Sequence, residues 1–338
     1  MRHHPPYIDL HCHLDGSITP EIAKKLAALQ QIPLPARNDR ELENLLSLPP
    51  DCENLNDFLR CFSLPLSLMQ TREGIREAVF LVQENLRSQE VAYGELRFAP
   101  QLHRDQGLTQ AQVLEAALEG LHRSPLLCNL ILCCMRGEKD QVREANLETV
   151  ELARRYLTSH GGVVALDLAG AEGLYPTRNF REEFRLAASY GIPFTIHAGE
   201  ADGPDSVRCA IELGARRIGH GVRAVLDPEV LELLKEHRIP LELCPTSNRQ
   251  TRAVTDMAKY PLRQFLELGI PVTVNTDDMA ICRTTVAREL DWLRSHCALT
   301  PEEEYILYCN AVEAAFTNEE TRQKLYCKAS DGTRINLL

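Results

Sequence analysis

Short apolar segments alternate with longer amphipathic segments along most of this chain. Eight of the apolar segments are rich in β-branched residues and have the length of buried β-strands. They are residues 7–13, 91–98, 126–135, 163–168, 193–197, 217–220, 240–244 and 271–276. Strands that are apolar almost throughout are typical of parallel sheets covered on both faces. The pattern therefore predicts an α/β protein with a parallel sheet.

The segments between the strands have the periodicity and the end signals of helices. Pro204 lies near the start of one expected helix and Gly214 follows its end. The last five strands begin at residues 163, 193, 217, 240 and 271, at intervals of 30, 24, 23 and 31 residues. These intervals are close to the ~30 residues per unit of a (β/α)8 TIM barrel. The alternative is an open doubly wound sheet, but no Gly-x-Gly-x-x-Gly follows the first strand.

Two stretches are longer than this repeat. Residues 30–71 are rich in leucine and proline, with Phe58 and Phe62 four positions apart, and predict a helical insertion after the first strand. Further helical patterns follow the eighth strand unit near the C-terminus. Because the loops after the strands build the active sites of barrels, the insertion would cover such a site. We therefore expect a single barrel domain over residues 1–338, with a helical lid and extra C-terminal helices.

The composition is that of a globular protein, with 44% hydrophobic and 25% charged residues. No apolar run approaches the ~20 residues of a membrane helix, and the N-terminus enters the first strand without an apolar signal segment. The formal net charge is −11 and the basic residues are dispersed, whereas nucleic-acid binding needs a basic face. We therefore expect a cytoplasmic protein without a membrane or nucleic-acid partner. No sequence feature indicates an oligomeric state.

Twelve cysteines are scattered through the chain, from Cys12 to Cys327. In a long chain without an export signal, such cysteines are reduced and usually buried. No Cys-x-x-Cys occurs, which argues against a cysteine zinc site.

Polar residues at the ends of several strands have the composition of a zinc hydrolase site. His11 and His13 alternate with Cys12 and therefore project from the same face of their strand. His197 ends the fifth strand and Asp277 follows the eighth, and in a barrel these ends converge on one face. Three imidazoles and one carboxylate would hold zinc and leave a position for water. A lone His-x-His is more often structural, but the convergence of four ligands favours a metal site.

Two further residues have positions suited to proton transfer. Glu200 lies three residues beyond His197 and could be an ordinary acid at a helix N-terminus. Beside a hydrolytic metal, however, a carboxyl that carries a proton is expected, and enclosure would raise its pKa. His220 lies between Gly219 and Gly221 and is either a turn histidine or a residue that holds or deprotonates the attacking water.

The remaining strand ends suggest substrate contacts and a single ion. Asp277 and Asp278 cannot both face an ion from a straight strand, so one should bind metal and the other substrate, unless both lie in a solvated loop. Gly170 could offer its backbone N–H to a ligand or simply form a turn. Residues 166–169 lack the lysine that bridges two metals in related barrels, which predicts one ion. The His-x-Glu and Pro-Cys-x-x-Cys signature of the zinc enzymes that deaminate nucleobases in nucleic acids is also missing.

Taken in order, these motifs closely resemble those of the adenosine deaminase family of the amidohydrolase superfamily. They are HCHLDGS at 11–17, DLAG at 167–170, HAGE at 197–200, RIGHG at 217–221, CPTSN at 244–248 and NTDD at 275–278. The resemblance runs from about residue 7 to residue 280. It implies a (β/α)8 barrel that converts adenosine and 2′-deoxyadenosine to inosine, 2′-deoxyinosine and ammonia in purine metabolism. One Zn2+ per chain would activate the water.

The resemblance also implies a role for each site residue. The expected zinc ligands are His11, His13, His197 and Asp277. As catalytic residues, Glu200 would donate a proton to purine N1 and His220 would assist the attacking hydroxide. The expected substrate-binding residues are His13, Asp15 (ribose), Gly170 (N3), Asp278 (N7) and the apolar lid positions Phe58 and Phe62.

Two positions depart from the family pattern, and several rival functions remain open. Met279 stands where many relatives have proline, and Arg249 follows the CPTSN motif, but neither removes a catalytic group. The nearest rival is a sister deaminase that acts on adenine, on an N6-substituted adenine nucleotide or on another adenosine derivative. A metal-dependent phosphoesterase barrel also begins with Asp-x-His-x-His but would need more metal ligands. A nucleoside-binding protein without turnover is disfavoured, because no expected catalytic group is missing.

Overall fold

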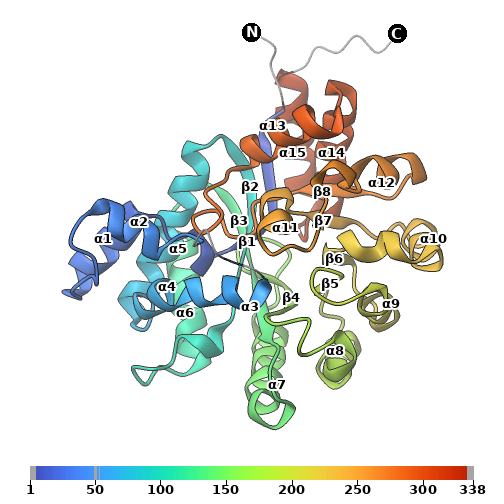
Figure 1. Ribbon diagram of the computed structural model, residues 1–338. Helices are drawn as coiled ribbons and strands as arrows, with labels where there is room; N and C mark the ends of the chain where they lie inside the picture. Colours follow the sequence, from blue (N-terminus) through green and yellow to red (C-terminus); the bar gives the residue numbers. More distant parts are fainter. Residues whose placement is uncertain (1–4, 49–51, 53, 333–338) are drawn as a thin grey trace.

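Within residues 5–48, 52 and 54–332, which the computed structural model describes, eight parallel strands lie inside a layer of helices (Figure 1). The strands are β1 (Tyr7–His13), β2 (Val91–Phe98), β3 (Leu127–Met135), β4 (Val163–Ala169), β5 (Thr195–Ala198), β6 (Arg217–His220), β7 (Leu241–Leu243) and β8 (Val272–Val274). Their ends lie within two residues of the predicted ones. The prediction of eight strands from apolar runs is therefore confirmed.

The strands close into a barrel. Neighbours in the orders β1-β2-β3-β4 and β5-β6-β7-β8 pair in parallel. Single bridges join the two halves: Leu166 of β4 donates its N–H to Pro193 O at 3.0 Å, and Asp277 donates to His11 O of β1 at 2.8 Å. This ring confirms the predicted α/β barrel and brings the carboxyl ends of all eight strands to one rim.

Helices connect the strands and cover the barrel. The longer ones are α1 (Pro20–Gln30), α5 (Arg72–Ser88), α6 (Gln110–Leu121), α7 (Lys139–Tyr156), α8 (Arg181–Ser189), α9 (Pro204–Leu213), α10 (Pro228–Glu236), α11 (Pro245–Gln250), α12 (Leu262–Leu268), α13 (Val286–Cys297), α14 (Pro301–Ala314) and α15 (Glu319–Gly332). Short 3-10 turns are η1 (Asp15–Ser17), η3 (Pro100–Leu102), η4 (Thr177–Phe180), η5 (Val222–Leu226) and η6 (Met257–Lys259). Helix α13 begins at Val286, because Thr285 caps it by accepting the Arg288 N–H.

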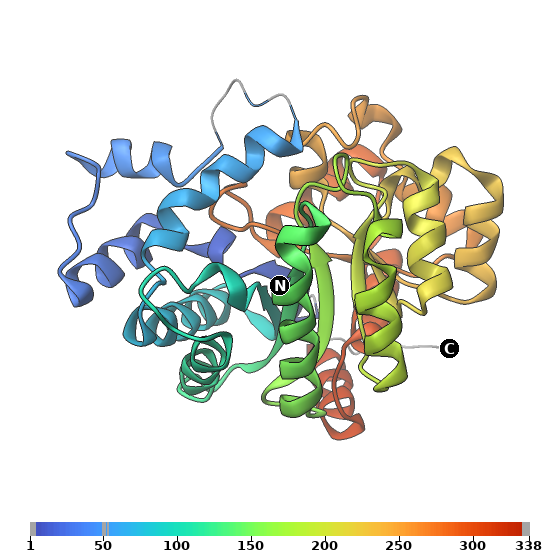
Figure 2. The same ribbon diagram turned by 90° about the horizontal axis from the view of Figure 1, so that it is seen from below.

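The insertion after β1 is helical, as predicted. It contains α2 (Asp39–Leu45), α3 (Leu55–Phe58), η2 (Leu59–Phe62) and α4 (Ser63–Ser67). In Figure 2 these light-blue helices lie at the upper left, whereas part of the red C-terminal segment lies at the bottom. Residues 49–51 and 53 of the insertion, and residues 1–4 and 333–338 at the two ends, lie outside the described part of the chain.

Buried charges fill the barrel interior beneath the site. Arg97 of β2 donates to Asp167 Oδ2 at 2.8 Å and to Glu242 Oε2 at 3.0 Å, and Arg217 donates to Glu242 Oε1 at 2.6 Å. All four side chains are almost completely buried. Charges in a low-dielectric interior are costly unless each is paired, so this network must be complete to be tolerated.

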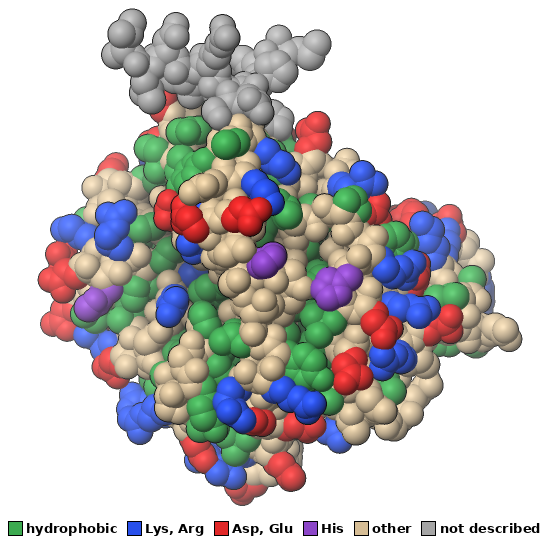
Figure 3. All heavy atoms as spheres, turned by 180° about the vertical axis from the view of Figure 1, so that it is seen from behind, with side chains coloured by type: hydrophobic (Ala, Val, Ile, Leu, Met, Phe, Trp, Pro, Cys, Tyr) green, Lys and Arg blue, Asp and Glu red, His purple; other side chains and the backbone are tan. Residues whose placement is uncertain are grey.

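Most of the cysteines are buried, as expected, and the surface carries charges of both signs. Basic and acidic side chains are interspersed on the face shown in Figure 3. None of the helices in the described residues is long and apolar enough to cross a bilayer. Ten of the twelve cysteines are buried, and the other two are Cys309 and Cys327.

Candidate active site

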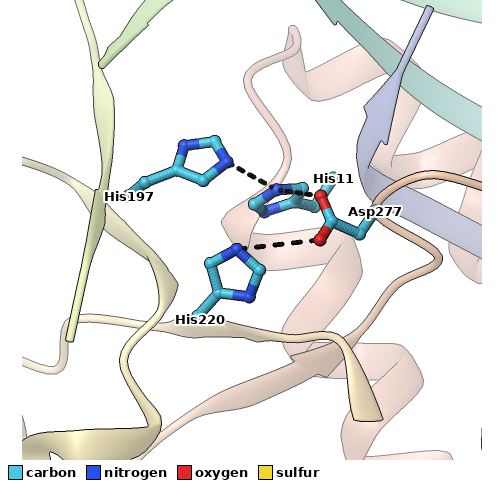
Figure 4. Close-up of side chains that lie close together, drawn as sticks. All are labelled: His11, His197, His220 and Asp277. Carbon is cyan, nitrogen blue, oxygen red and sulfur yellow. Dashed lines mark hydrogen bonds and ion pairs between the residues drawn. The ribbon is translucent and has the colours of Figure 1, made fainter. Parts of the chain in front are cut away.

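Four buried side chains from distant parts of the chain meet at the carboxyl ends of the strands. They are His11 of β1, His197 of β5, His220 of β6 and Asp277, which follows β8. One donor atom from each lies within 4.8 Å of the donors of the other three. Figure 4 shows the three rings and the carboxylate directed toward one another. Such a group of imidazole and carboxylate donors suits a transition metal such as zinc.

A fifth side chain, His13, reaches the same point from β1. His13 Nε2 lies 3.1 Å from His197 Nε2 and 3.4 Å from Asp277 Oδ1. His11 Nε2 lies 3.0 Å from His197 Nε2 and 3.1 Å from Asp277 Oδ1. Four donors bound at ~2.0–2.1 Å to one ion would be separated by roughly 2.9–3.4 Å. The spacing of His11, His13, His197 and Asp277 therefore fits a single zinc ion.

Carboxylates behind two of the histidines fix which nitrogen faces the ion. His11 Nδ1 lies 2.7 Å from Glu242 Oε2, and His197 Nδ1 lies 2.9 Å from Asp167 Oδ2. An imidazole that donates Nδ1–H to a carboxylate directs its Nε2 lone pair toward the metal. Burial also lowers the pKa of His197 to about 4, despite the opposing effect of Asp167. Neutral rings with free Nε2 lone pairs are what zinc requires.

The hydrogen bonds of His220 place the proton on the other ring nitrogen from that of His11 and His197. Tyr260 donates its hydroxyl to Asn248 Oδ1 at 3.0 Å, which directs the amide of Asn248 at His220 Nδ1, also 3.0 Å away. A ring that accepts at Nδ1 carries its proton on Nε2 when neutral. His220 Nε2 faces Glu200 Oε2 at 3.6 Å and Asp277 Oδ2 at 3.8 Å. This tautomer favours a hydrogen-bonding role for His220 over a ligand role.

Left-handed backbone after β6 and β8 directs these side chains inward. His220 has a φ of 60° and Asp277 a φ of 62°, values that non-glycine residues rarely adopt. The backbone of Asp277 is nonetheless held in place by two bonds to β1. Its N–H donates to His11 O, and its carbonyl oxygen accepts the His13 N–H at 2.7 Å. The bend also explains how the adjacent Asp277 and Asp278 both face the site, which a straight strand would not allow.

A small cavity adjoins the metal-binding donors. Its lining combines the polar site with an apolar cover and consists of His13, Leu55, Phe58, Leu59, Phe62, Ala169, Gly170, His197, Glu200, His220, Asp277 and Asp278. The apolar cover comes from α3 and η2 of the insertion. A cavity with apolar walls and a few convergent polar groups is typical of a small-molecule site.

Two carboxyl groups in this cavity are held in an apolar environment. Burial raises the pKa of Glu200, and burial together with Asp277 raises the pKa of Asp278 well above its ordinary value. Asp278 Oδ1 is buried without a hydrogen-bond partner among the described residues. A buried polar atom without a partner beside a cavity is available for a hydrogen bond to a ligand.

Comparison with known proteins assigns the chain to a family. The sequence model of the family described as adenosine deaminase matches residues 6–331. An adenosine deaminase of Haemophilus ducreyi is 47% identical over 324 residues, which cover 94% of each chain. Another from Clostridium botulinum (strain Okra / Type B1) is 42% identical over 326 residues, 95% of this chain and 96% of the relative. The protein belongs to the adenosine deaminase family.

A solved structure supports the same fold for this adenosine deaminase family member. The crystal structure of adenine deaminase from Arthrobacter aurescens has a TM-score of 0.84 and 25% sequence identity. It covers 97% of this chain and 98% of that chain. The barrel is therefore shared over nearly the full length of both proteins.

The predicted site residues of this family member come together with one exception. The cavity lining includes both catalytic candidates and all the predicted metal ligands apart from the deeper His11. It also includes the predicted substrate contacts His13, Gly170, Asp278, Phe58 and Phe62. Asp15 is buried in η1, where burial raises its pKa to about 6, and it is outside the described cavity lining. Its proposed ribose contact stays a prediction.

Sequence reasoning missed the residues that support the site. Glu242 lies within an apolar strand, and Asp167 begins the DLAG motif at 167–170, but neither context marks its residue as the partner of a histidine. Leu55 and Leu59 were also missed, although the spacing 55, 58, 59, 62 places them on one helical face with the two phenylalanines.

Proposed function

We propose that this protein catalyses the zinc-dependent hydrolytic deamination of adenosine and 2′-deoxyadenosine. The products would be inosine or 2′-deoxyinosine, and ammonia. The observation that carries the proposal is the buried group of His11, His13, His197 and Asp277 beside the buried carboxyl of Glu200. Membership of the adenosine deaminase family supports the choice of substrate.

Each residue then has a task that its surroundings favour. A bound zinc ion would supply one function, which is to lower the pKa of a water molecule. Glu200, kept protonated by burial, donates its proton to purine N1 and thereby draws electrons from C6. His220 Nε2, next to Glu200, orients the attacking oxygen. Asp278, also kept protonated, donates to N7.

The backbone of β4 and the insertion complete the proposed binding mode. Gly170, with a φ of 105°, lines the cavity where its N–H would meet purine N3. Leu55, Phe58 and Phe62 would exclude water above the ring, so that residues 30–71 serve as a lid on a single barrel domain. Water exclusion strengthens every charge interaction in the site.

A sister deaminase acting on adenine is the second candidate, and the structural likeness to an adenine deaminase favours it. A nucleotide substrate is disfavoured, because the described residues that line the cavity include no lysine or arginine to pair with phosphate. The same lack of a phosphate partner weakens a phosphoesterase. The cytoplasmic location stays a prediction of the sequence.

A substrate panel tests the proposed function. We expect the specificity constant for adenosine to exceed those for adenine and AMP by at least ~100-fold. Adenine lacks the ribose that the site is proposed to bond, and the cavity lining offers no cation to pair with the phosphate of AMP. The fall in ultraviolet absorbance on deamination measures each rate. A preference for free adenine, for an N6-methylated substrate or for a 5′-nucleotide would instead assign the protein to a sister activity.

Replacing Gly16 should impair the purine contact of Asp278 without affecting the metal. A Cβ added at Gly16 would lie 1.7 Å from Asp278 Oδ1, so Gly16→Ala must displace this carboxyl. We expect the specificity constant for adenosine to fall by roughly 10–100-fold with zinc content unchanged, since a displacement near 1 Å costs about this much. Gly203→Ala is the control, because neither glycine has a positive φ and a Cβ added at Gly203 would have no atom within 4 Å. Normal kinetics in Gly16→Ala would remove Asp278 from the binding site.

A further inference from the structure

A carboxylate outside the catalytic group holds the backbone that carries Glu200. Glu172 is completely buried in the segment after β4. Its Oε1 accepts the N–H of Gly199 at 2.7 Å, and its Oε2 accepts those of Glu200, Ala201 and Asp202 at 2.9, 2.6 and 3.0 Å. One side chain therefore satisfies four consecutive backbone donors.

This arrangement requires an anion. Gly199 has a φ of 72°, which turns the chain so that successive N–H groups converge into a concave nest. An ionised carboxylate offers about four lone pairs and no donor, whereas a glutamine amide would present an NH2 group to some of the same N–H donors. Burial raises the pKa of Glu172, but Arg136 and the bonded amides outweigh this effect and lower it below its ordinary value.

His197, which precedes this segment and is a proposed metal ligand, is held by other residues. Arg136 is buried and donates to the carbonyl oxygen of His197 and to Thr177 Oγ1. The His197 ring is fixed separately by Asp167. Removing the Glu172 carboxylate therefore leaves the four N–H groups of 199–202 without their acceptor, whereas the bonds to the carbonyl and ring of His197 do not involve Glu172.

We propose that Glu172 is a positioning residue that fixes the backbone of 199–202 so that the Glu200 carboxyl meets the substrate ring. This inference rests on the proposed deamination, in which Glu200 is the proton donor. Glu172 does not line the cavity among the described residues, so it acts through Glu200 and not on the substrate. Its loss should consequently lower kcat more than it raises KM.

The test compares Glu172→Gln with Glu183→Gln. Glu183 is also a buried glutamate, but it lies on α8 and is not among the described residues that line the cavity. For Glu172→Gln we expect kcat for adenosine to fall by roughly 10–100-fold, with KM within about threefold of wild type. Zinc content and inhibition by 1-deazaadenosine, which lacks the ring nitrogen that Glu200 would protonate, should also be retained. Glu183→Gln should keep the wild-type kcat.

Other outcomes separate the two proposals. An unmodified protein that does not deaminate adenosine contradicts the proposed function, whereas an active protein with an unchanged kcat in Glu172→Gln contradicts the positioning role alone. If Glu172→Gln loses zinc or 1-deazaadenosine binding in parallel with kcat, the positioning role is also contradicted. If Glu172→Gln does not fold, Glu172→Asp keeps the charge but is too short to reach all four amides, and the same kcat loss is expected. Failure of both variants to fold would show that Glu172 supports the fold as a whole, and would equally overturn the proposal.

Discussion

The Glu200→Gln variant should bind zinc and nucleoside as the wild type does and lose nearly all deamination. The amide has the size of the carboxyl but cannot transfer a proton to purine N1. Positioned acid catalysis of this kind is worth about 10²–10⁴ in rate, and we expect kcat to fall within that range. Ultraviolet kinetics give kcat and KM, metal analysis gives zinc per chain, and inhibition by 1-deazaadenosine reports ligand binding.

The surroundings of Glu200 explain why its proton is available at neutral pH. The side chain is 3% exposed, and burial is the largest effect that raises its pKa, although His220 opposes it. Glu183→Gln again serves as the matched buried variant and should retain full turnover. Unchanged turnover in Glu200→Gln would contradict the proton-donor role, and a loss of zinc would show that the carboxyl supports the metal site instead.

The sequence predicted the barrel because its signal is repeated and local. Buried parallel strands must be apolar on both sides, so segments such as 126–135 and 163–168 stand out without any knowledge of their neighbours. The convergence of His11, His197 and Asp277 then follows from the barrel itself, since strand ends far apart in sequence share one rim. The fold and the convergence of these donor side chains were thus predictable together.

The supporting residues were not predictable, because their roles depend on contacts across the barrel. Glu242 pairs with His11 from a strand more than two hundred positions away, and its own segment is simply apolar. Asn248 fixes His220 only because Tyr260 orients its amide. Likewise, the inward turn at Asp277 arises from a left-handed φ that no local sequence motif predicts. Such features follow from the register of neighbouring strands and the shape of loops.

His13→Ala should lose tightly bound zinc, whereas His220→Ala should keep zinc and lose turnover. Either His13 or His220 could complete a set with His11, His197 and Asp277, because both rings lie close to the other donors. The hydrogen bonds decide between them: Asn248 occupies Nδ1 of His220, so its Nε2 carries the proton and cannot bind an ion. Loss of a residue that only supports a ligand weakens metal affinity by about 10–100-fold. Loss of a ligand itself should therefore weaken zinc affinity by more than this.

Zinc per chain after dialysis against a weak chelator measures the difference between the two variants. Wild-type protein stripped by a strong chelator should be inactive and should recover with added Zn2+, because the ion is the group proposed to lower the pKa of the attacking water. If His220→Ala loses zinc and His13→Ala retains it, the donor set is the alternative one, and Asn248 must then turn its carbonyl toward His220 on metal binding. If both variants retain zinc, the ion is held elsewhere and the proposed chemistry fails at its first step.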